Sequence, residues 1–198
     1  MKTLPLIVLV ASFLNASCAL TPLSVTIRPT VDMAATSLGQ GQTVGVTVID
    51  ERPRSIVGYR GIGPYGPTGA TITTAGDPAS AVQAALADGL KRHGFNPVTG
   101  QSPAGSGLRA EIRGLDYTIS QAIFSSTLRA EFTLKGICII GSARHYEGTY
   151  RGEHEENIQF VQTDSGVEEY LNMVSSRAIQ RLLQDPQLIQ CLARSTSR

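Results

Sequence analysis

The chain has 198 residues, of which 17 are basic and 16 are acidic, so its formal net charge is +1. A hydrophobic content of 41% suffices for the core of one domain. Lysines and arginines form no stripe along the sequence, which excludes a nucleic acid as an electrostatically recognised partner.

The N-terminus has the pattern of a bacterial export signal. Lys2 precedes an apolar run, Leu4–Leu14, and small residues at 16 and 17 lead to Cys18. A cysteine directly after such a cut site is the mark of a lipoprotein, whose acyl chains anchor the mature protein in a membrane. We therefore expect residues 1–17 to be a signal peptide and Cys18 to carry the lipid.

Other interpretations of this segment stay open. Cleavage after Ala19 would release a soluble periplasmic protein, because Ser17 and Ala19 are both small and suitably spaced. An uncut anchor would need about 20 apolar residues, roughly twice the length of this run. Asn15 also stands where lipoprotein signals usually have leucine. If Cys18 is lipidated, Ala19 in place of an aspartate indicates the outer membrane, with the protein facing the periplasm.

Residues 18–42 are expected to form a lipid-anchored, flexible tether with a short edge strand at Ser24–Arg28. Thr43–Ile49 is β-branched and apolar, which predicts a central strand. Charged residues follow that strand directly, and an ion pair between Asp50 and Arg52 would fix the next loop. The alternative is that Asp50 and Arg52 contact a partner or ligand.

Residues 53–76 are rich in glycine and proline, which predicts a long loop. Structureless loops of this length are unusual in a compact domain and are often functional. Tyr59 and Tyr65 lie in this segment and are candidate partner contacts, since aromatic residues are enriched at interfaces. A loose hairpin with Ile72 near its return strand is the alternative.

A helix is predicted to start at Asp77-Pro78, because aspartate caps helices and proline suits the first helical position. Gly94 would end it. Three strands follow at 108–120, 127–140 and 145–160, with a bulge near Gly114 where the apolar phase shifts by one residue. The last large helix would start with a capping box made by Ser165 and Glu168.

Asp185-Pro186 would begin a short final helix, and residues 194–198 would form a frayed tail. Strands that run together, with helices gathered on one face, predict an α+β fold. We expect an antiparallel β-meander sheet with two main helices packed on one face, in a single domain of residues 43–193.

Two cysteines remain besides Cys18. Cys138 and Cys191 both lie in phase with apolar neighbours, so both are predicted to face the core. In the oxidising periplasm they are candidates for a disulfide. The alternative is a pair of buried free thiols, since cysteine is among the most frequently buried residues.

No catalytic signature stands out. The sequence contains no nucleophile elbow or P-loop, and the formal G-x-G-x-x-G at 61–66 is followed by no immediate helix. The acids next to His154 alternate between strand faces, so we predict no metal site. We expect no catalytic residues and no cofactor. Carboxylates in the strands are more simply cross-strand partners for neighbouring bases; they are Glu111, Asp116, Glu131 and Glu147.

Several segments together resemble the YajG family of bacterial lipoproteins. They are the signal with Cys18, the strand 44–48 leading to Asp50-x-Arg52, the run 90–95, the strand 108–120, the hairpin arm 146–151, and the ending around Asp185. The resemblance implies an outer-membrane lipoprotein with no established activity and no catalytic residues to carry over. We expect a non-enzymatic accessory protein with an envelope protein partner. A module that binds a small molecule, lipid or glycan, and an envelope hydrolase, are the alternatives.

Overall fold

The computed structural model describes residues 21–63, 66–100, 106–121, 125–159 and 163–194. Eight strands are present in them: β1 (Leu23–Thr26), β2 (Thr43–Asp50), β3 (Ile56–Gly63), β4 (Gly66–Ala75), β5 (Asn96–Thr99), β6 (Ser106–Gln121), β7 (Ser126–Ile140) and β8 (Ala143–Ile158). The helices there are α2 (Pro78–Arg92), α3 (Asp164–Leu183) and α4 (Pro186–Ala193). No helix in these ranges is long and apolar enough to span a membrane.

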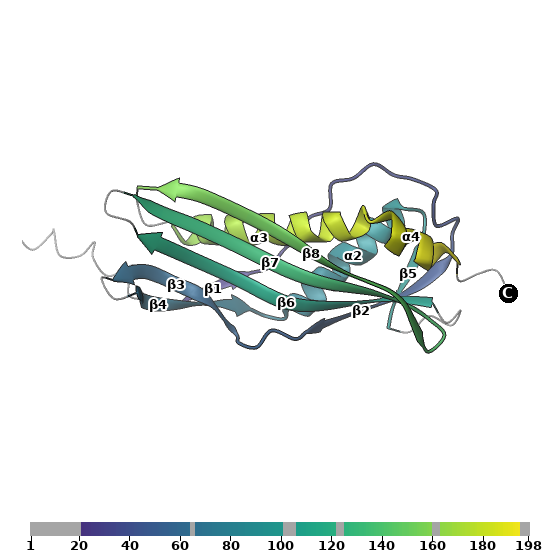
Figure 1. Ribbon diagram of the computed structural model, residues 1–198, viewed down its shortest axis with the longest axis horizontal. Helices are drawn as coiled ribbons and strands as arrows, with labels where there is room; N and C mark the ends of the chain where they lie inside the picture. The colour runs from purple at the N-terminus through teal and green to yellow at the C-terminus, as the bar shows by residue number, and fades with distance from the viewer. Residues whose placement is uncertain (1–20, 64–65, 101–105, 122–124, 160–162, 195–198) are drawn as a thin grey trace, which may run out of the picture.

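The strands form one mixed sheet (Figure 1). β6, β7 and β8 are the predicted antiparallel meander. The other edge of β6 is shared, because β2 pairs with its first half and β3 with its second half, both in parallel. β1 with β4 and β2 with β5 are also parallel pairs, which the sequence analysis did not include. The α+β class is confirmed.

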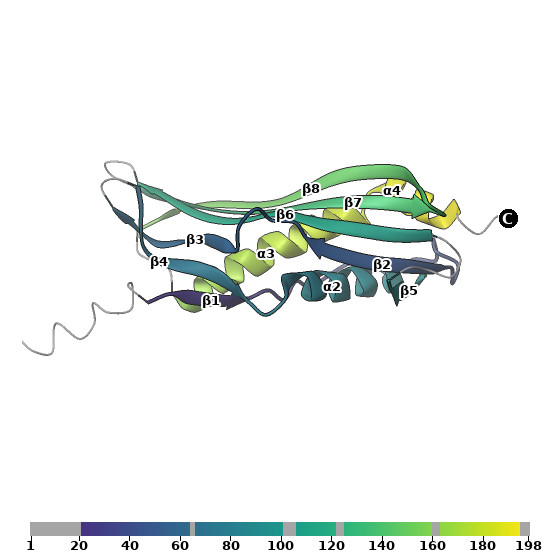
Figure 2. The ribbon, with the colours of Figure 1, turned by 90° about the horizontal axis from the view of Figure 1, so that it is seen from below.

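All three helices cover one face of the sheet, and the core lies between the two layers (Figures 1 and 2). The burial pattern of β7 reflects this arrangement. Every second side chain from Leu128 to Leu134 is completely buried, while Arg129 is exposed. That alternation is typical of an antiparallel strand with one face in the core. The opposite face of the sheet, here called the outer face, carries most of the charged side chains of β6–β8, whereas Glu156 of β8 lies on the helix side and accepts a hydrogen bond from Tyr170 of α3.

The molecule is elongated and its long strands join two ends (Figures 1 and 2). At the first, the β1 end, β1 begins, β3 ends at Gly63, and β7 begins at Ser126. At the second, the disulfide end, β7 turns into β8 at Gly141 and Cys138 is bonded to Cys191 in α4.

The prediction of a loop is wrong for most of residues 53–76, which form the antiparallel β3–β4 hairpin instead. One of the glycines, Gly58, is required by close packing, whereas Gly69 and Gly76 have positive φ angles. A Cβ atom on Gly58 would lie 2.1 Å from the carbonyl oxygen of Tyr117, so only glycine fits where β3 reaches β6. Register shifts near Val57 and Arg60 complete the irregular pairing. The hairpin alternative is therefore the correct one.

The helix starts were predicted with mixed success. Asp77 caps α2 as expected, accepting hydrogen bonds from the amides of Ala79 (3.0 Å) and Ser80 (3.3 Å). The predicted capping box of α3 is wrong, because the cap is Thr163, whose hydroxyl accepts from the Gly166 amide at 3.2 Å. Glu168 is thereby free to accept from the Thr26 amide, 3.0 Å away in β1.

Residues 21–42, expected as tether and edge strand, pack along the domain. β1 is an edge strand, and the chain after it is held to α3 by a ladder of side chains four residues apart, here called the α3 ladder. It consists of Glu168, Asn172, Ser176 and Gln180, which bond to the backbone of residues 26–32. The reason is geometric, since residues four apart lie on one helix face. Residues 18–20 lie outside the described residues.

The longest strand at a free edge of the sheet is β8, which pairs only with β7. Two arginines of α3 reach this edge. Arg177 donates to the carbonyl of Glu153 at 2.7 Å, and Arg181 donates to the carbonyl of Arg151. Part of the edge is thus occupied by side chains of its own molecule.

Candidate functional site

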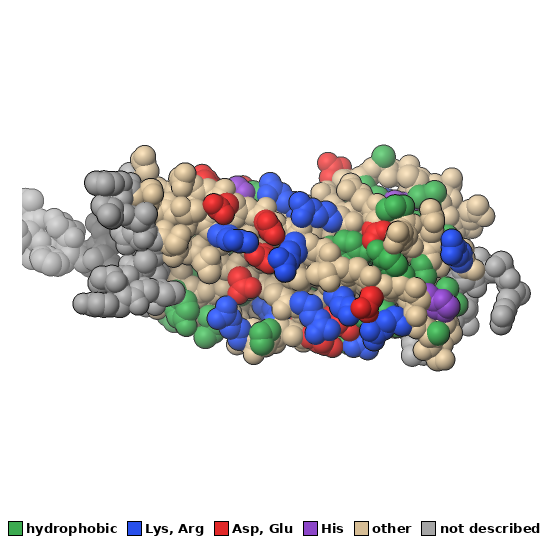
Figure 3. Space-filling view, in the orientation of Figure 1, with side chains coloured by type: hydrophobic (Ala, Val, Ile, Leu, Met, Phe, Trp, Pro, Cys, Tyr) green, Lys and Arg blue, Asp and Glu red, His purple; other side chains and the backbone are tan. Residues whose placement is uncertain are grey.

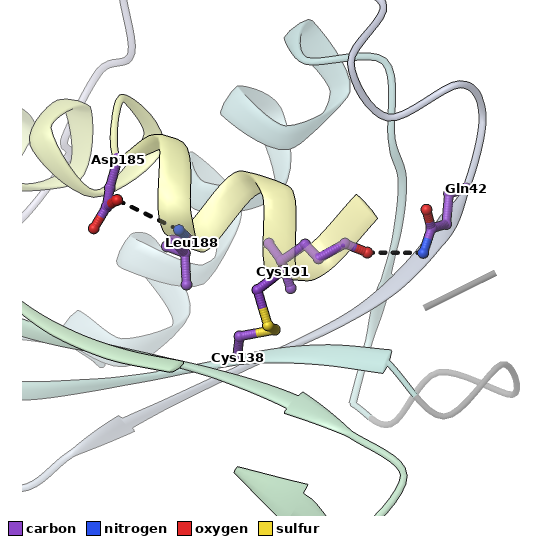
Figure 4. The surroundings of a disulfide bond; sticks show 6 residues. Gln42, Cys138, Asp185, Leu188 and Cys191 are labelled. Carbon is purple, nitrogen blue, oxygen red and sulfur yellow. Dashed lines mark hydrogen bonds between the residues drawn. A yellow bond between two sulfur atoms is a disulfide. The ribbon is translucent and has the colours of Figure 1, made fainter. Parts of the chain in front are cut away.

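The disulfide end is built around α4, which is attached to the sheet covalently. Cys191 of α4 and Cys138 of β7 form a disulfide with their Cα atoms 6.4 Å apart (Figure 4). Both residues face the core, as the apolar phase predicted. Next to them, the buried amide of Gln42 donates to the carbonyl of Leu192 at 2.8 Å. The helix is therefore held from two sides.

Asp185, at the junction of α3 and α4, ties the helices to β8. One carboxylate oxygen caps α4 by accepting from the amides of Gln187 (2.9 Å) and Leu188 (3.4 Å). The other accepts hydrogen bonds of 2.6 Å from the hydroxyls of both Tyr146 and Tyr150. Both tyrosines are on the helix-facing side of β8, where the even spacing places them.

These contacts shift the ionisation of all three groups. Burial opposes the charge on Asp185, but the tyrosine and amide hydrogen bonds outweigh it and hold the pKa below its ordinary value. The pKa of Tyr150 is raised by burial and by the bond to Asp185, and that of Tyr146 is raised mainly by the same carboxylate. The cluster therefore keeps a carboxylate and two neutral hydroxyls at neutral pH.

A polar hollow of about 280 Å³ lies beside the disulfide. Its lining comes from the β7–β8 turn and from α4, and consists of Ile140, His145, Tyr146, Gln187, Gln190, Cys191 and Arg194. Amide, imidazole and guanidinium groups at its rim provide hydrogen-bond donors and acceptors. The hollow is open and shallow enough for a side chain or a small polar group.

A second hollow, of about 100 Å³, opens where β3 meets β6. Tyr59 and Arg54 contribute to its largely apolar lining. Asp50 is the last residue of β2, and Arg52 follows it in the turn that leads to β3. Their side chains form an ion pair with each other, at 2.7 Å. The hydrogen bond from Arg52 lowers the pKa of Asp50. This pair holds the turn after β2, as the structural interpretation predicted.

Charged side chains on the outer face form ion pairs (Figure 3). Glu111 is almost completely buried and contacts Arg109, at 3.0 Å, and Arg113. Glu51 contacts the same two arginines at 3.3 Å and 2.8 Å, which closes a neutral ring of four charges. Glu111 thus has basic partners as predicted, but Arg109 and Arg113 lie on its own strand, β6, and not across the sheet.

The other predicted carboxylates also have basic partners. Glu147 pairs across the sheet with Lys135 at 3.0 Å, as predicted. Glu131 pairs with Arg129 of its own strand at 3.2 Å and with Arg151 of β8 at 3.7 Å. Asp116 pairs with Arg54, which precedes β3, at 2.8 Å and not with one of the predicted bases. Within the described ranges no group of three or more His, Cys, Asp or Glu residues is arranged to hold a metal ion.

Two predicted site residues, Cys18 and Tyr65, lie outside the described residues. Two roles were not predicted from the sequence. Asp185 was expected only at a helix start, and nothing was expected of Arg60, a buried arginine of β3 that pairs with Asp164 and donates to the carbonyl of Thr21 at 3.4 Å. Arginine within an apolar, glycine-rich segment was the available signal for a buried ion pair.

Comparison with solved structures finds the same fold in other bacteria. A Xanthomonas campestris protein has a TM-score of 0.55 at 12% identity, over 85% of this chain and 95% of that one. A Helicobacter pylori protein, described as a putative neuraminyllactose-binding hemagglutinin homolog, has a TM-score of 0.50 at 8% identity, over 84% and 95%. A minor lipoprotein of Acinetobacter baumannii has a TM-score of 0.43 at 10% identity, over 77% and 90%.

A comparison with curated protein sequences gives no match. The comparison with protein families gives one, described as "Uncharacterized lipoprotein", which spans residues 29–193. This range runs from the segment after β1 to the end of α4 and so includes the α3 ladder, the outer-face ion pairs and the disulfide. The chain therefore belongs to this family of uncharacterised bacterial lipoproteins, of the YajG type.

Proposed function

We propose that the protein is anchored by a lipid on Cys18 in the outer membrane, faces the periplasm, and acts without catalysis by binding another envelope component. The observation that supports the proposed anchoring is the short distance in sequence between Cys18 and the first described residue. Thr21, only three residues after Cys18, already has its carbonyl bonded to the buried Arg60. A cysteine this close to the fold suits attachment to a surface better than burial in a core.

The outer-face ion pairs support a role other than catalysis. Glu131 and Glu147 each contact two basic groups, as Glu111 does. A general acid needs a carboxyl group whose pKa is raised toward neutral pH. The two cations beside Glu147 lower its pKa instead. These carboxylates are thus suited to holding strands together.

The hollow at the disulfide end is the contact site that we propose for the partner. The disulfide, Gln42 and Asp185 hold its α4 wall in place, and a rigid wall lowers the entropic cost of binding. Its volume of about 280 Å³ is just below the 300–1,000 Å³ typical of sites that enclose a small molecule. A protruding side chain of an envelope protein fits this size better than a whole ligand.

Lipidation is tested by labelling cells with an alkyne fatty acid. The wild type should be labelled and Cys18→Ser should not. Equal labelling of both, or a mature N-terminus at Leu20, would reject the anchor in favour of cleavage after Ala19.

Partner binding is tested by placing a photoreactive residue at Gln190, on the rim of the hollow, and irradiating intact cells. The matched control is the same residue at Thr149, which is exposed on the outer face of β8. A discrete cross-linked protein is expected from position 190 alone. The same product from both positions, or bound lipid or sugar in native mass spectra of the purified protein, would favour a different surface or the small-molecule alternative.

A further inference from the structure

The short chain between Cys18 and the fold limits how the molecule can sit on a membrane. Five residues separate Cys18 from Leu23, so the chain can reach back at most about 17 Å from the first residue of β1. Leu23 pairs with Ile72 in β4. Gly66, where β4 starts, is six residues before Ile72, which corresponds to about 20 Å of strand.

The reach of the chain before β1, about 17 Å, nearly equals the length of β4 before Ile72, about 20 Å. Both stretches run in the same direction because β1 and β4 are parallel. A fully extended chain along the axis of β1 therefore brings Cys18 about level with Gly66, the first residue of β4. The bond from Arg60 to the Thr21 carbonyl fixes the first described residue to β3. A lipid on Cys18 thus cannot enter a bilayer in this direction unless the hairpin end comes down to the bilayer surface.

The β1 end is chemically suited to that position. The terminal residues of the long strands there are uncharged, and they include Ser120, Ser126, Thr127 and Asn157. Asp164, at the start of α3, is an exposed carboxylate at this end, and it is neutralised by its ion pair with Arg60. The charged groups visible in Figure 3 lie further along the sheet. Bringing uncharged polar groups against lipid head groups avoids the large cost of desolvating ions.

We infer that the β1 end rests on the membrane surface that carries the lipid, and that the disulfide end stands away from it by the length of β7, about 50 Å. This inference rests on the proposed lipidation of Cys18. It places the hollow beside α4 far from the anchoring membrane, where only a component that extends into the periplasm reaches it.

The test uses two matched positions at opposite ends of β7. Ser125 and Ser142 are both exposed serines just outside the strand, Ser125 at the β1 end and Ser142 at the disulfide end. Each is changed to cysteine in the full-length lipidated protein and given a nitroxide spin label. The native cysteines do not react, because Cys138 and Cys191 are bonded to each other and Cys18 carries the lipid.

The labelled proteins are reconstituted in vesicles of phosphatidylethanolamine and phosphatidylglycerol that contain nickel-chelating lipid. The nickel should relax the label at 125 several-fold more than the label at 142. Equal relaxation of both labels would mean that the molecule lies flat, and stronger relaxation at 142 would mean that it is inverted. Either result overturns the inference.

Flotation of the vesicles separates this result from failure of the anchor. If the unmodified protein does not float with vesicles, the lipidation proposal fails. The chain from residue 18 is then coupled through Cys18 to a maleimide lipid, with the spin label on a ketone-bearing residue at 125 or 142. The same comparison then decides the orientation.

Discussion

The carbonyl oxygen of Val174 in α3 lies 1.8 Å from the place that a Cβ atom would take on Gly152 of β8. The helix and the sheet therefore touch backbone to backbone at this point. The Ala178 amide nitrogen is 3.0 Å from the same place, so no rotation of a side chain can make room. The α3 ladder also holds residues 26–32. A change in the distance between α3 and the sheet would therefore affect both α3 itself and this N-terminal segment.

We expect Gly152→Ala to push α3 away from β8 and to lower the free energy of unfolding by at least about 2 kcal/mol, because overpacking a close contact strains the backbone. Urea denaturation measures the change. Gly114→Ala is the matched control, because its nearest obstacle is a flexible carboxylate oxygen of Asp116 at 3.3 Å. A similar loss in both variants would show that the close approach at Gly152 is not what limits packing.

Removing the disulfide should destabilise the disulfide end most. The bond closes a loop of 53 residues, which is worth about 4 kcal/mol in the chain-entropy model. In a Cys18→Ser background, Cys191→Ala should lower the free energy of unfolding and speed amide exchange in α4 more than in α2. Two free thiols titrated in the oxidised, denatured Cys18→Ser protein would contradict the bond itself.

The Asp185 cluster should give the protein a pH-dependent part of its stability. The pKa of Asp185 is lower in the folded protein than in the unfolded chain. Its contribution is therefore complete above the unfolded pKa, about 4, and is lost as pH falls through the folded value. Asp185→Asn should lower the free energy of unfolding by about 1 kcal/mol at pH 7, because a neutral amide oxygen accepts weaker hydrogen bonds from Tyr146 and Tyr150 than the carboxylate does.

The difference in stability between Asp185→Asn and the wild type should narrow as the pH falls from about 4 through the lower folded pKa of Asp185, since below that pKa both proteins carry a neutral side chain at this position. Thermal unfolding across this range measures it. Asp88→Asn serves as the control, because Asp88 forms an exposed pair with Arg92 at 3.2 Å. Exposed pairs of this kind contribute only about 0.3–0.5 kcal/mol. If the difference in stability between Asp185→Asn and the wild type stayed constant with pH, the charge of Asp185 would not contribute to stability as proposed.

Asn172 is expected to be the most sensitive member of the α3 ladder, because its amide bonds to the backbone of both Thr26 and Arg28. Asn172→Ala should lower the free energy of unfolding by about 1–3 kcal/mol, since partly buried backbone groups lose their partners. Hydrogen exchange of the Arg28 amide should become faster. Glu169→Ala, on the exposed side of the same helix, should leave that amide unchanged.

The elements with strong local signals were predictable from the sequence. Asp77-Pro78 and Gly94 mark the ends of α2 by cap and turn chemistry, which depends only on neighbouring residues. The bulge at Gly114 appeared as a change of phase and is present in the β6–β7 register. The inward phase of Cys138 and Cys191 likewise follows from residues nearby.

Contacts between distant segments were not predictable. The glycines and prolines of the β3–β4 hairpin suggest a loop until the backbone of Tyr117 lies against Gly58. The α3 ladder joins side chains to a backbone more than 140 residues away, and a backbone partner leaves no trace in the sequence. Tyr146 and Tyr150 showed their common face but not their common partner, Asp185, because it is 39 and 35 residues away and is brought close only by the fold.

The arginines that reach β8 affect the tendency of the protein to aggregate at high concentration. An unpaired edge strand is a template onto which a strand from another chain can add, and that addition is a route to aggregation. Arg177 and Arg181 already donate to the carbonyls of Glu153 and Arg151, two of the acceptors that an incoming strand would need. Two charged side chains from α3 would have to be displaced before a neighbour could extend the sheet. The longest free edge in the described structure is thus made a poor site for self-assembly.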